Sequence, residues 1–443
     1  MTSKVSFYIP CFNAAKTIGP CLDAVFKQEY PAVEVIVVDD GSTDESARIV
    51  SRYPVRLLSH ANNLGLAAAR NTAIKSATGD FIASMDADCC PQTNWLGLLM
   101  SKLSSPEIAA AGGKLLEGNS KTVFDEWRSV RMRQNWDGLN TSPPFLFGSN
   151  TVFRKEALVN IGYYRECYKN NYEDVDISTR LISAGYVLAY EPQAIAHHLR
   201  NDNIASLFDT YWKWNFDFYQ KDGFYSSLDN FMSKAKDTVG LVNRYMEEDI
   251  VFNRTRLLYL DFLLFFYQSL KDLYYFSFSD SRYSAFGDMD ILSVRLSLLD
   301  LVFFYHWDFE NSDFTTLIPA KDAFLQNFFA LNLVLGRAIR SRFPDRNFMT
   351  TLYKHLLLLF CNFEDPVLPG KIVNLIESHS DWSGLYKKYQ LNLNSLFLSN
   401  LSLYFYRWFE DMVERNPGII QMLELSANQT QEACVFMQKG GLC

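Results

Sequence analysis

The residues that point most directly to chemistry are acids that follow an apolar, strand-like segment. Asp86 and Asp88 come directly after the apolar residues 81–85. Carboxylates at positions i and i+2 of an extended segment point the same way, and they repel each other unless a cation lies near them. Such oxygen ligands suit Mg²⁺ or Mn²⁺ carrying a diphosphate. An acidic loop without a metal is the alternative, because the D-x-D pattern is common.

A second acidic pair and two histidines follow later in the chain. Glu173 and Asp174 precede a short amphipathic pattern that ends near Gly185. A helix N-terminus favours the carboxylate form, which can accept a proton, although simple capping of the helix is equally open. His197 and His198 end the next strand-like segment. A neutral imidazole can bind Mn²⁺, although either histidine could instead be structural.

Three earlier turns also carry polar groups. Pro10-Cys11-Phe12-Asn13 supplies a rigid turn, an aromatic face that could stack on a base, and an amide. In the turn Asp39–Asp44, Ser42 together with Glu45 matches a capping box for the next helix. The third turn leads into Arg70, which could meet a phosphate or be an ordinary solvated charge.

The apolar pattern predicts the elements that position these groups. Short β-branched runs at residues 5–9, 33–38, 55–58 and 80–85 alternate with helical patterns such as 14–27 and 66–77. An alternation of strands and helices predicts an α/β fold with a parallel sheet. Ligands of such sheets bind beyond the carboxyl ends of the strands, where the polar turns fall.

The composition changes near residue 240. Residues 1–240 hold 14 of the 21 glycines but only 13 of the 35 phenylalanines. Later segments show helical spacing of apolar residues, as in Leu257, Leu260, Leu264 and Tyr267. We therefore predict an α/β domain over residues 1–235 and a mainly α-helical domain over 240–443. Its aromatic residues indicate a core, with recognition of a substrate, of a partner protein or of a second copy as the alternative.

The composition argues against several classes of protein. A formal net charge of −8 without a run of Lys or Arg argues against nucleic-acid binding. No signal-peptide pattern opens the sequence, and the most apolar stretch is about 14 residues, shorter than a transmembrane helix. The 8 cysteines show no metal-ligand spacing and indicate reduced thiols. We expect a cytoplasmic protein without a transmembrane segment, or one attached peripherally to the inner face of a membrane.

In their order along the chain, these motifs resemble the inverting nucleotide-sugar glycosyltransferases of family 2, which have the GT-A fold. The resemblance spans residues 3–200 and depends on the ordered series. Its residues are Pro10 to Asn13, Val38 to Asp44, Asn63 to Gly65, Arg70-Asn71, Asp86-Ala87-Asp88, Gly148 to Asn150, Arg154, Glu173 to Asp176 and His197-His198. It implies an α/β, Rossmann-like, mixed and mostly parallel sheet, followed here by the α-helical domain.

The resemblance implies a role for each matching residue. The nucleotide would contact Pro10, Phe12, Asn13, Asp40, Asn63, Arg70 and Asp86, with Asp40 bound to the base. The metal, Mn²⁺ or Mg²⁺, would be held by Asp88, His198 and Asp86, with His197 as the alternative to His198. Asp174 would be the general base, and Glu173 would orient it or the acceptor. The implied donor is a nucleoside-diphosphate sugar, expected to be UDP-linked, and the acceptor a glycan, a lipid-linked sugar or a protein.

The sequence also departs from the family's pattern. It reads Gly162-Tyr163-Tyr164-Arg165 where members often carry Gly-Gly-Phe-Asp, so acceptor contacts are expected to differ there. It lacks the Gln/Arg-x-x-Arg-Trp motif of processive synthases, which disfavours a processive, membrane-embedded enzyme. A catalytically idle sugar-nucleotide-binding scaffold that acts through its helical domain is the alternative function. A dinucleotide-dependent oxidoreductase is disfavoured, because no G-x-G-x-x-G follows the first strand.

Overall fold

The computed structural model describes residues 3–118, 122–139, 142–168, 171–221, 228–279 and 407–439, together with positions 348, 351, 352, 355 and 359. The chain divides into two compact units. The N-terminal unit comprises Met1–Asp202 and Thr210–Phe218, and the C-terminal unit comprises Asn203–Asp209 and Tyr219–Cys443. The expected boundary between residues 235 and 240 stays a prediction.

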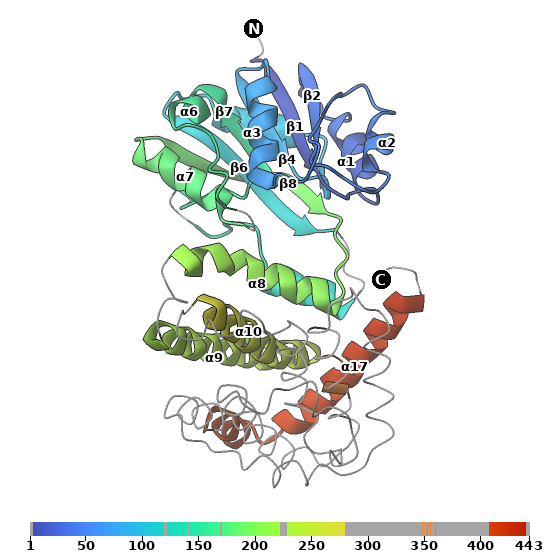
Figure 1. Ribbon diagram of the computed structural model, residues 1–443, viewed down its shortest axis with the longest axis vertical. Coiled ribbons are helices and arrows are strands. Elements are labelled where there is room, and N and C mark those ends of the chain that lie inside the picture. The colour runs from blue at the N-terminus through green and yellow to red at the C-terminus, as the bar shows by residue number, and fades with distance from the viewer. Residues whose placement is uncertain are drawn as a thin grey trace. The chain divides into compact units, whose positions relative to one another are not determined.

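The N-terminal unit is built on an eight-stranded sheet with the strand order β3-β2-β1-β4-β7-β6-β8-β5 (Figure 1). The strands are β1 (Val5–Cys11), β2 (Glu34–Asp39), β3 (Arg56–Ser59), β4 (Phe81–Met85), β5 (Cys89–Pro91), β6 (Ile108–Glu117), β7 (Asn150–Arg154) and β8 (Val187–His198). Strand β1 is parallel to β2 and β4, β2 to β3, and β6 to β8. Strands β7 and β5 are antiparallel to their neighbours. The predicted mixed, mostly parallel sheet is confirmed.

Helices cover both faces of this sheet. One core includes residues of α1 (Ile18–Val25), α2 (Ser46–Val50) and α4 (Trp95–Lys102). The other includes residues of α3 (Leu66–Ser76), α6 (Lys155–Asn160) and α7 (Glu173–Ser183). Neighbouring residues of β1 alternate between the two cores, with Phe7 in the first and Tyr8 in the second. Because both faces are buried, β1 and β4 are largely apolar, which is why their sequence predicts them.

The predicted capping box of Ser42 and Glu45 is wrong. Helix α2 begins at Ser46, and its N-cap residue, Glu45, makes no capping hydrogen bond. The Ser42 Oγ instead accepts a hydrogen bond of 2.9 Å from the Asn13 backbone N–H. Asp44 Oδ1 accepts one of 2.9 Å from the Ser46 N–H. Ser42 therefore ties the turn after β2 to the turn after β1, and Asp44 rather than Ser42 accepts from the first N–H of α2.

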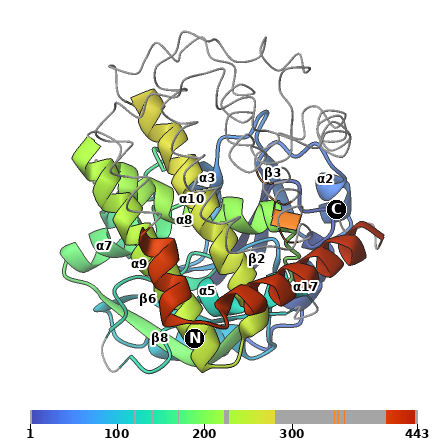
Figure 2. The same ribbon diagram turned by 90° about the horizontal axis from the view of Figure 1, so that it is seen from below.

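The described part of the C-terminal unit is helical, as predicted. It contains α9 (Leu228–Val251), a 3₁₀ turn at Thr255–Leu257, α10 (Leu258–Ser279) and α17 (Ile419–Lys439), while α8 (Ile204–Lys221) has residues in both units. Helices α9 and α10 lie side by side (Figures 1 and 2). Leu257, Leu260, Leu264 and Tyr267 are buried. Expected helices in 280–347 and most of 349–406 lie outside the described residues and stay predictions.

Within the described ranges, no helix combines sufficient length with sufficient apolar character to cross a bilayer.

Candidate functional site

The predicted acids gather around the carboxyl ends of the parallel strands. Asp86 follows β4, and Asp88 lies in the turn between β4 and β5. The Cys89 N–H donates to the Asp86 carbonyl oxygen at 3.0 Å, which closes a turn. The extended conformation expected for residues 86–88 is therefore wrong. As a result, the two carboxylates engage different partners.

Arg70 joins Asp86 to the acidic pair at the start of α7. Its Nη2 donates to Asp86 Oδ1 at 3.1 Å, and its Nη1 donates to Glu173 Oε1 at 2.8 Å. The side chain is 1% exposed, so the alternative of a solvated helix charge is excluded. Burial lowers the pKa of Arg70, but Asp86 and Glu173 more than compensate and hold it well above its ordinary value. Both terminal nitrogens of this buried cation are thus engaged by carboxylates.

Gly148 lies directly against this guanidinium. A Cβ at position 148 would lie 2.7 Å from Arg70 Cζ and closer still to Nη1, so the position requires glycine unless Arg70 moves. Ser84 Oγ donates to the Gly148 carbonyl at 2.6 Å. The Gly148 N–H in turn donates to Asp174 Oδ2 at 3.3 Å. Gly148 therefore stands between Arg70 and Asp174 and links both to the sheet.

Asp174 has the features of a proton acceptor. Its carboxylate accepts hydrogen bonds from the N–H groups of Gly148 and, at 2.8 Å, Val175. Burial raises the pKa of both Glu173 and Asp174, and Arg70 opposes the rise in each case. A carboxylate with a raised pKa is a better base at neutral pH than an ordinary one. The N-terminal position of both acids on α7 agrees with the sequence prediction.

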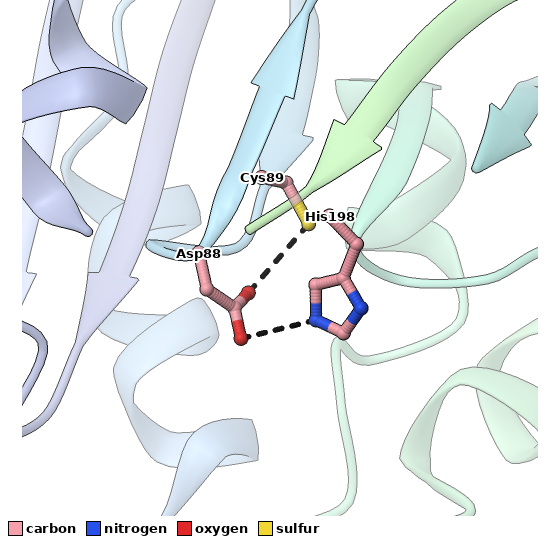
Figure 3. Close-up of side chains that lie close together, drawn as sticks. All are labelled: Asp88, Cys89 and His198. Carbon is pink, nitrogen blue, oxygen red and sulfur yellow. Dashed lines mark hydrogen bonds and ion pairs between the residues drawn. The ribbon is translucent and has the colours of Figure 1, made fainter. Parts of the chain in front are cut away.

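Asp88 and His198 form the second cluster of the site (Figure 3). His198 Nε2 lies 3.1 Å from Asp88 Oδ2. Its Nδ1 faces Glu117, at 3.1 Å from Oε2 and 3.3 Å from Oε1. Burial lowers the pKa of His198, but the two carboxylates outweigh this effect and raise it to about 9. Burial also raises the pKa of Asp88, but His198 opposes it and holds that pKa well below its usual range.

These side chains fit a divalent cation. Donor atoms of Asp88, Cys89 and His198 lie within 4.8 Å of one another. A carboxylate oxygen and an imidazole nitrogen are suitable ligands for Mn²⁺. Burial and the Asp88 carboxylate raise the pKa of the Cys89 thiol well above its ordinary value, which disfavours the thiolate that would bind metal. Asp86 is outside this cluster, and its Oδ1 accepts from Arg70.

The structure distinguishes the two neighbouring histidines. His198 ends β8 beside Asp88, whereas His197 Nε2 lies 3.5 Å from Gln92 Nε2. Successive side chains of a strand point to opposite faces, so one of the pair faces the site and the other does not. The structure brings His198, rather than His197, to Asp88.

Asp40 is buried and organises the loop before α3. Its Oδ1 accepts from the Leu64 N–H at 2.9 Å and its Oδ2 from the Gly65 N–H at 2.9 Å. His60 Nδ1 lies 2.6 Å from Oδ1. The residue is 3% exposed. The neighbouring Gly41 adopts a φ of 76°, and a Cβ there would lie 2.7 Å from the Asn62 backbone. These contacts hold the turn after β2 against the loop that leads into α3.

The remaining nucleotide-side candidates lie on two turns. Pro10 is buried within β1, while Phe12 is 48% exposed just beyond that strand. Asn13 has a φ of 49°, and its Oδ1 accepts from the Thr43 N–H at 2.8 Å. Asn63 is exposed in the loop before α3. Of these residues, Phe12 presents the accessible aromatic face that the sequence predicts.

Three residues of the site were not predicted: Glu117, Cys89 and His60. Glu117 ends a largely apolar segment at residues 108–117, and His60 directly follows β3. Both therefore carry the signal that singles out Asp86, a polar side chain at the end of a strand. Cys89 has no such signal, because its proximity to His198 results from the pairing of β5 with β8.

The comparisons with known sequences agree with these motifs. Residues 6–162 match the family described as Glycosyl transferase family 2. Glycosyltransferase AglE of Haloferax volcanii is 29% identical over 206 residues, which cover 44% of this chain and 66% of that protein. The poly-beta-1,6-N-acetyl-D-glucosamine synthase of Staphylococcus epidermidis is 25% identical over 221 residues, which cover 47% and 53%. The chain therefore spans about half to two thirds of the length of these relatives.

The solved structures that resemble this chain have a lower sequence identity to it than these relatives do. The mannosyltransferase PcManGT from Pyrobaculum calidifontis, in complex with GDP-Man and Mn²⁺, has a TM-score of 0.40 and 18% identity, covering 85% of this chain and 88% of that one. Residues 1–349 of S. aureus TarS in complex with UDP have a TM-score of 0.38 and 16% identity, covering 80% and 90%.

Proposed function

Residues 6–162 of this chain match glycosyl transferase family 2, and from this match we propose that the protein is an inverting, metal-dependent glycosyltransferase. It moves a sugar from a nucleoside-diphosphate sugar to an acceptor hydroxyl. The observation that carries the proposal is the buried ion-pair chain Asp86–Arg70–Glu173. It joins the acids after β4, on the donor side, to the acids of α7, on the acceptor side.

In the proposed reaction, Asp174 accepts the proton of the acceptor hydroxyl. The acceptor oxygen attacks the anomeric carbon as the bond from that carbon to the diphosphate oxygen breaks, so one displacement inverts the anomeric centre. The Gly148 and Val175 N–H groups hold the Asp174 carboxylate in place. Glu173 is directed to Arg70, so we assign it a positioning role for the start of α7.

A divalent cation, Mn²⁺ or Mg²⁺, would be held by Asp88 and His198. When bound, it offsets the charge that builds on the departing nucleoside diphosphate. Asp86 is proposed to lie on the donor side of the site, where its hydrogen bond from Arg70 fixes the direction of its carboxylate. Arg70 itself supports the acids rather than contacting a phosphate, because contact would require it to leave its carboxylate partners.

The nucleotide is proposed to lie over the turns after β1 and β2. Phe12 offers a ring for stacking, and Asn13 and Asn63 offer amides beside Pro10. Asp40 reaches the base only if it gives up part of its contact with the Leu64 and Gly65 N–H groups, so the geometry favours an indirect role for it. UDP is the proposed nucleotide, and N-acetylglucosamine is the first sugar to test, given the name of the S. epidermidis relative.

The acceptor is proposed to be a glycan, a lipid-linked sugar or a protein. The C-terminal unit is proposed to recognise this acceptor, a partner protein or a second copy of the chain. The proposed location is the cytoplasm, including the inner face of a membrane. These assignments rest on the resemblance of the N-terminal residues and on the aromatic composition of the remainder.

The test uses the full chain, a panel of UDP- and GDP-sugars, and release of the nucleoside diphosphate with and without Mn²⁺. We expect cation-dependent release from at least one donor. Asp174→Asn should slow it by about 10²–10⁴-fold, the usual contribution of a general base, while donor binding persists. Glu156→Gln is the control, because Glu156 is an exposed acid in the first turn of α6.

Two outcomes would contradict the proposal. If the chain binds no nucleotide sugar, the assignment of a donor site is rejected. Binding without turnover, with every acceptor class supplied, would instead support the catalytically idle scaffold. Full activity of Asp174→Asn would reject the assignment of the base alone.

A further inference from the structure

Glu117, the last residue of β6, has no role in the reaction proposed above. Its side chain is 11% exposed and lies behind His198, on the opposite side of the imidazole from Asp88. Both carboxylate oxygens are within 3.3 Å of His198 Nδ1. The imidazole is therefore held between two carboxylates, one at each ring nitrogen.

This arrangement is the one by which proteins orient a metal-binding histidine. Such a histidine binds metal through one ring nitrogen and donates its other N–H to a carboxylate or carbonyl, which fixes the tautomer and the direction of the ring. In the neutral form that binds metal, an Nδ1–H that donates to Glu117 leaves the lone pair of His198 on Nε2. Nε2 is the nitrogen that faces Asp88.

Glu117 is itself held in place. Its Oε1 accepts from Arg128 Nε at 3.0 Å, and Arg128 is almost fully buried on α5 (Val123–Arg131). The Arg128 Nη1 donates to Asp202 Oδ2 at 2.9 Å, so the arginine has a second carboxylate partner. Glu117 also pairs with His198 in the parallel register of β6 and β8, and the Gly118 N–H donates to the His198 carbonyl at 2.8 Å.

We propose that Glu117 is a positioning residue for the metal site, holding the His198 ring with Nε2 directed at the cation beside Asp88. This inference rests on the proposed metal-dependent function. Arg128 of α5 keeps Glu117 directed at the imidazole. The buried ion pairs of Arg128 with Glu117 and Asp202 therefore support the metal site. A purely structural Glu117 would serve only to pair with Arg128.

The test measures Mn²⁺ affinity of the full chain in the presence of UDP, by the loss of the free Mn²⁺ signal in electron paramagnetic resonance. We expect Glu117→Ala to weaken Mn²⁺ binding about 10–100-fold, the range for partners that orient a metal ligand. Glu117→Gln should show a smaller loss, because its amide oxygen still accepts from Nδ1–H but carries no charge. Glu107→Ala is the matched control: Glu107 is exposed and immediately precedes the same strand.

A double variant separates positioning from a structural effect. If Glu117 acts through His198, then Glu117→Ala should cause no further loss of Mn²⁺ affinity in a chain that already carries His198→Ala. An equal loss in both backgrounds would overturn the inference. If Glu117→Ala does not fold, Glu117→Gln provides the same comparison, since Arg128 keeps Asp202 as its partner.

Mn²⁺ binding by the wild-type chain distinguishes failure of the Glu117 positioning role from failure of the metal site. If it binds Mn²⁺ with UDP while Glu117→Ala and Glu117→Gln bind equally well, the positioning role is rejected and the proposed function stands. If the wild-type chain binds no Mn²⁺ with UDP, the metal site and the inference are both rejected.

Discussion

Glu173 and Asp174 are neighbours in sequence, yet their hydrogen bonds direct them to different tasks. Glu173 accepts from the buried Arg70, and Asp174 accepts from two backbone N–H groups. Deprotonated Glu173 forms an ion pair with Arg70, whereas Asp174 pairs with no cation among the described residues and is half-buried. This difference is the physical reason to assign the base role to Asp174 rather than to Glu173.

The raised pKa of Asp174 predicts the acidic limb of the pH–rate profile. Burial raises this pKa, Arg70 lowers it, and Asp86 raises it further. Because the base must be deprotonated, turnover should fall with decreasing pH at a higher pH than for an aspartate of ordinary pKa, about 3.9. A profile of kcat against pH, measured with saturating donor, checks this expectation.

The loss of activity caused by protonating Asp174 can be distinguished from a loss caused by unfolding. A carboxyl whose pKa is higher in the folded than in the unfolded chain binds its proton more tightly when folded, so protonating Asp174 does not itself destabilise the protein. Circular dichroism across the same pH range should therefore show that activity is lost before structure. Activity that stays constant down to the pKa of an ordinary aspartate would count against Asp174 as the base.

The two adjacent histidines provide a matched pair for testing the metal site. His198→Ala should weaken Mn²⁺ binding in the presence of UDP by at least about tenfold, because it removes a proposed ligand. His197→Ala should leave it unchanged, because His197 faces Gln92. Isothermal titration of both variants checks this, and the opposite ranking would exchange the two assignments.

At the scale of elements, the site depends on how closely the segment before β7 approaches α3. Gly148 contacts the Arg70 guanidinium, and its backbone binds both Ser84 of β4 and Asp174 of α7. Small residues Ala67, Ala68 and Ala69 let α3 pack close to the sheet, which buries Arg70. Three elements therefore meet at one glycine.

Gly148→Ala should disrupt this meeting point. The added Cβ would displace an arginine that two carboxylates hold in place, and such overpacking typically costs about 1–3 kcal/mol. Turnover should fall further than stability alone explains, because the Asp86–Arg70–Glu173 chain would be broken. Urea denaturation and donor hydrolysis, measured on the same preparation, check the two effects.

Gly97→Ala is the control for that substitution. Gly97 lies in α4, where, among the described residues outside that helix, an added Cβ would come within 4 Å of Tyr30 Cβ alone, at 3.9 Å. It should keep full activity and gain slightly in stability, since alanine favours a helix over glycine by about 1 kcal/mol. Equal behaviour of the two variants would contradict the close contact at Gly148.

At the scale of the whole molecule, the chain has two compact units with separate buried residues. The N-terminal unit holds the cores on the two faces of its sheet. The described part of the C-terminal unit buries apolar side chains such as Leu260, Phe262, Phe409 and Leu423. The predicted nucleotide and metal residues all belong to the N-terminal unit.

Calorimetry of the full chain should therefore show two transitions. UDP with Mn²⁺ should raise the midpoint of only one of them, because a ligand at 100 times its Kd stabilises the state that binds it by about 2.7 kcal/mol. Asp88→Ala should remove most of this shift, since it removes a proposed ligand of the cation. A single transition, or an equal shift of both, would contradict independent unfolding of the units.

Much of the N-terminal fold could be predicted from sequence because its strands are buried on both faces. The helix predicted at 66–77 is observed as Leu66–Ser76, and that predicted at 14–27 as the shorter Ile18–Val25. The ends differ because local periodicity does not report where tertiary contacts begin. The capping box failed for a related reason: Ser42 bonds to Asn13, 29 residues away in sequence.

The sequence by itself determined that acids and histidines stand at the ends of strands, in an order that resembles one enzyme family. Only the tertiary structure decided what each side chain touches. It separated Asp86 from Asp88, brought Arg70 to a glutamate 103 residues away, and set Glu117 behind His198. The physical reason is that strand order and register determine these contacts, and a shift of one residue along a strand turns every side chain to the opposite face.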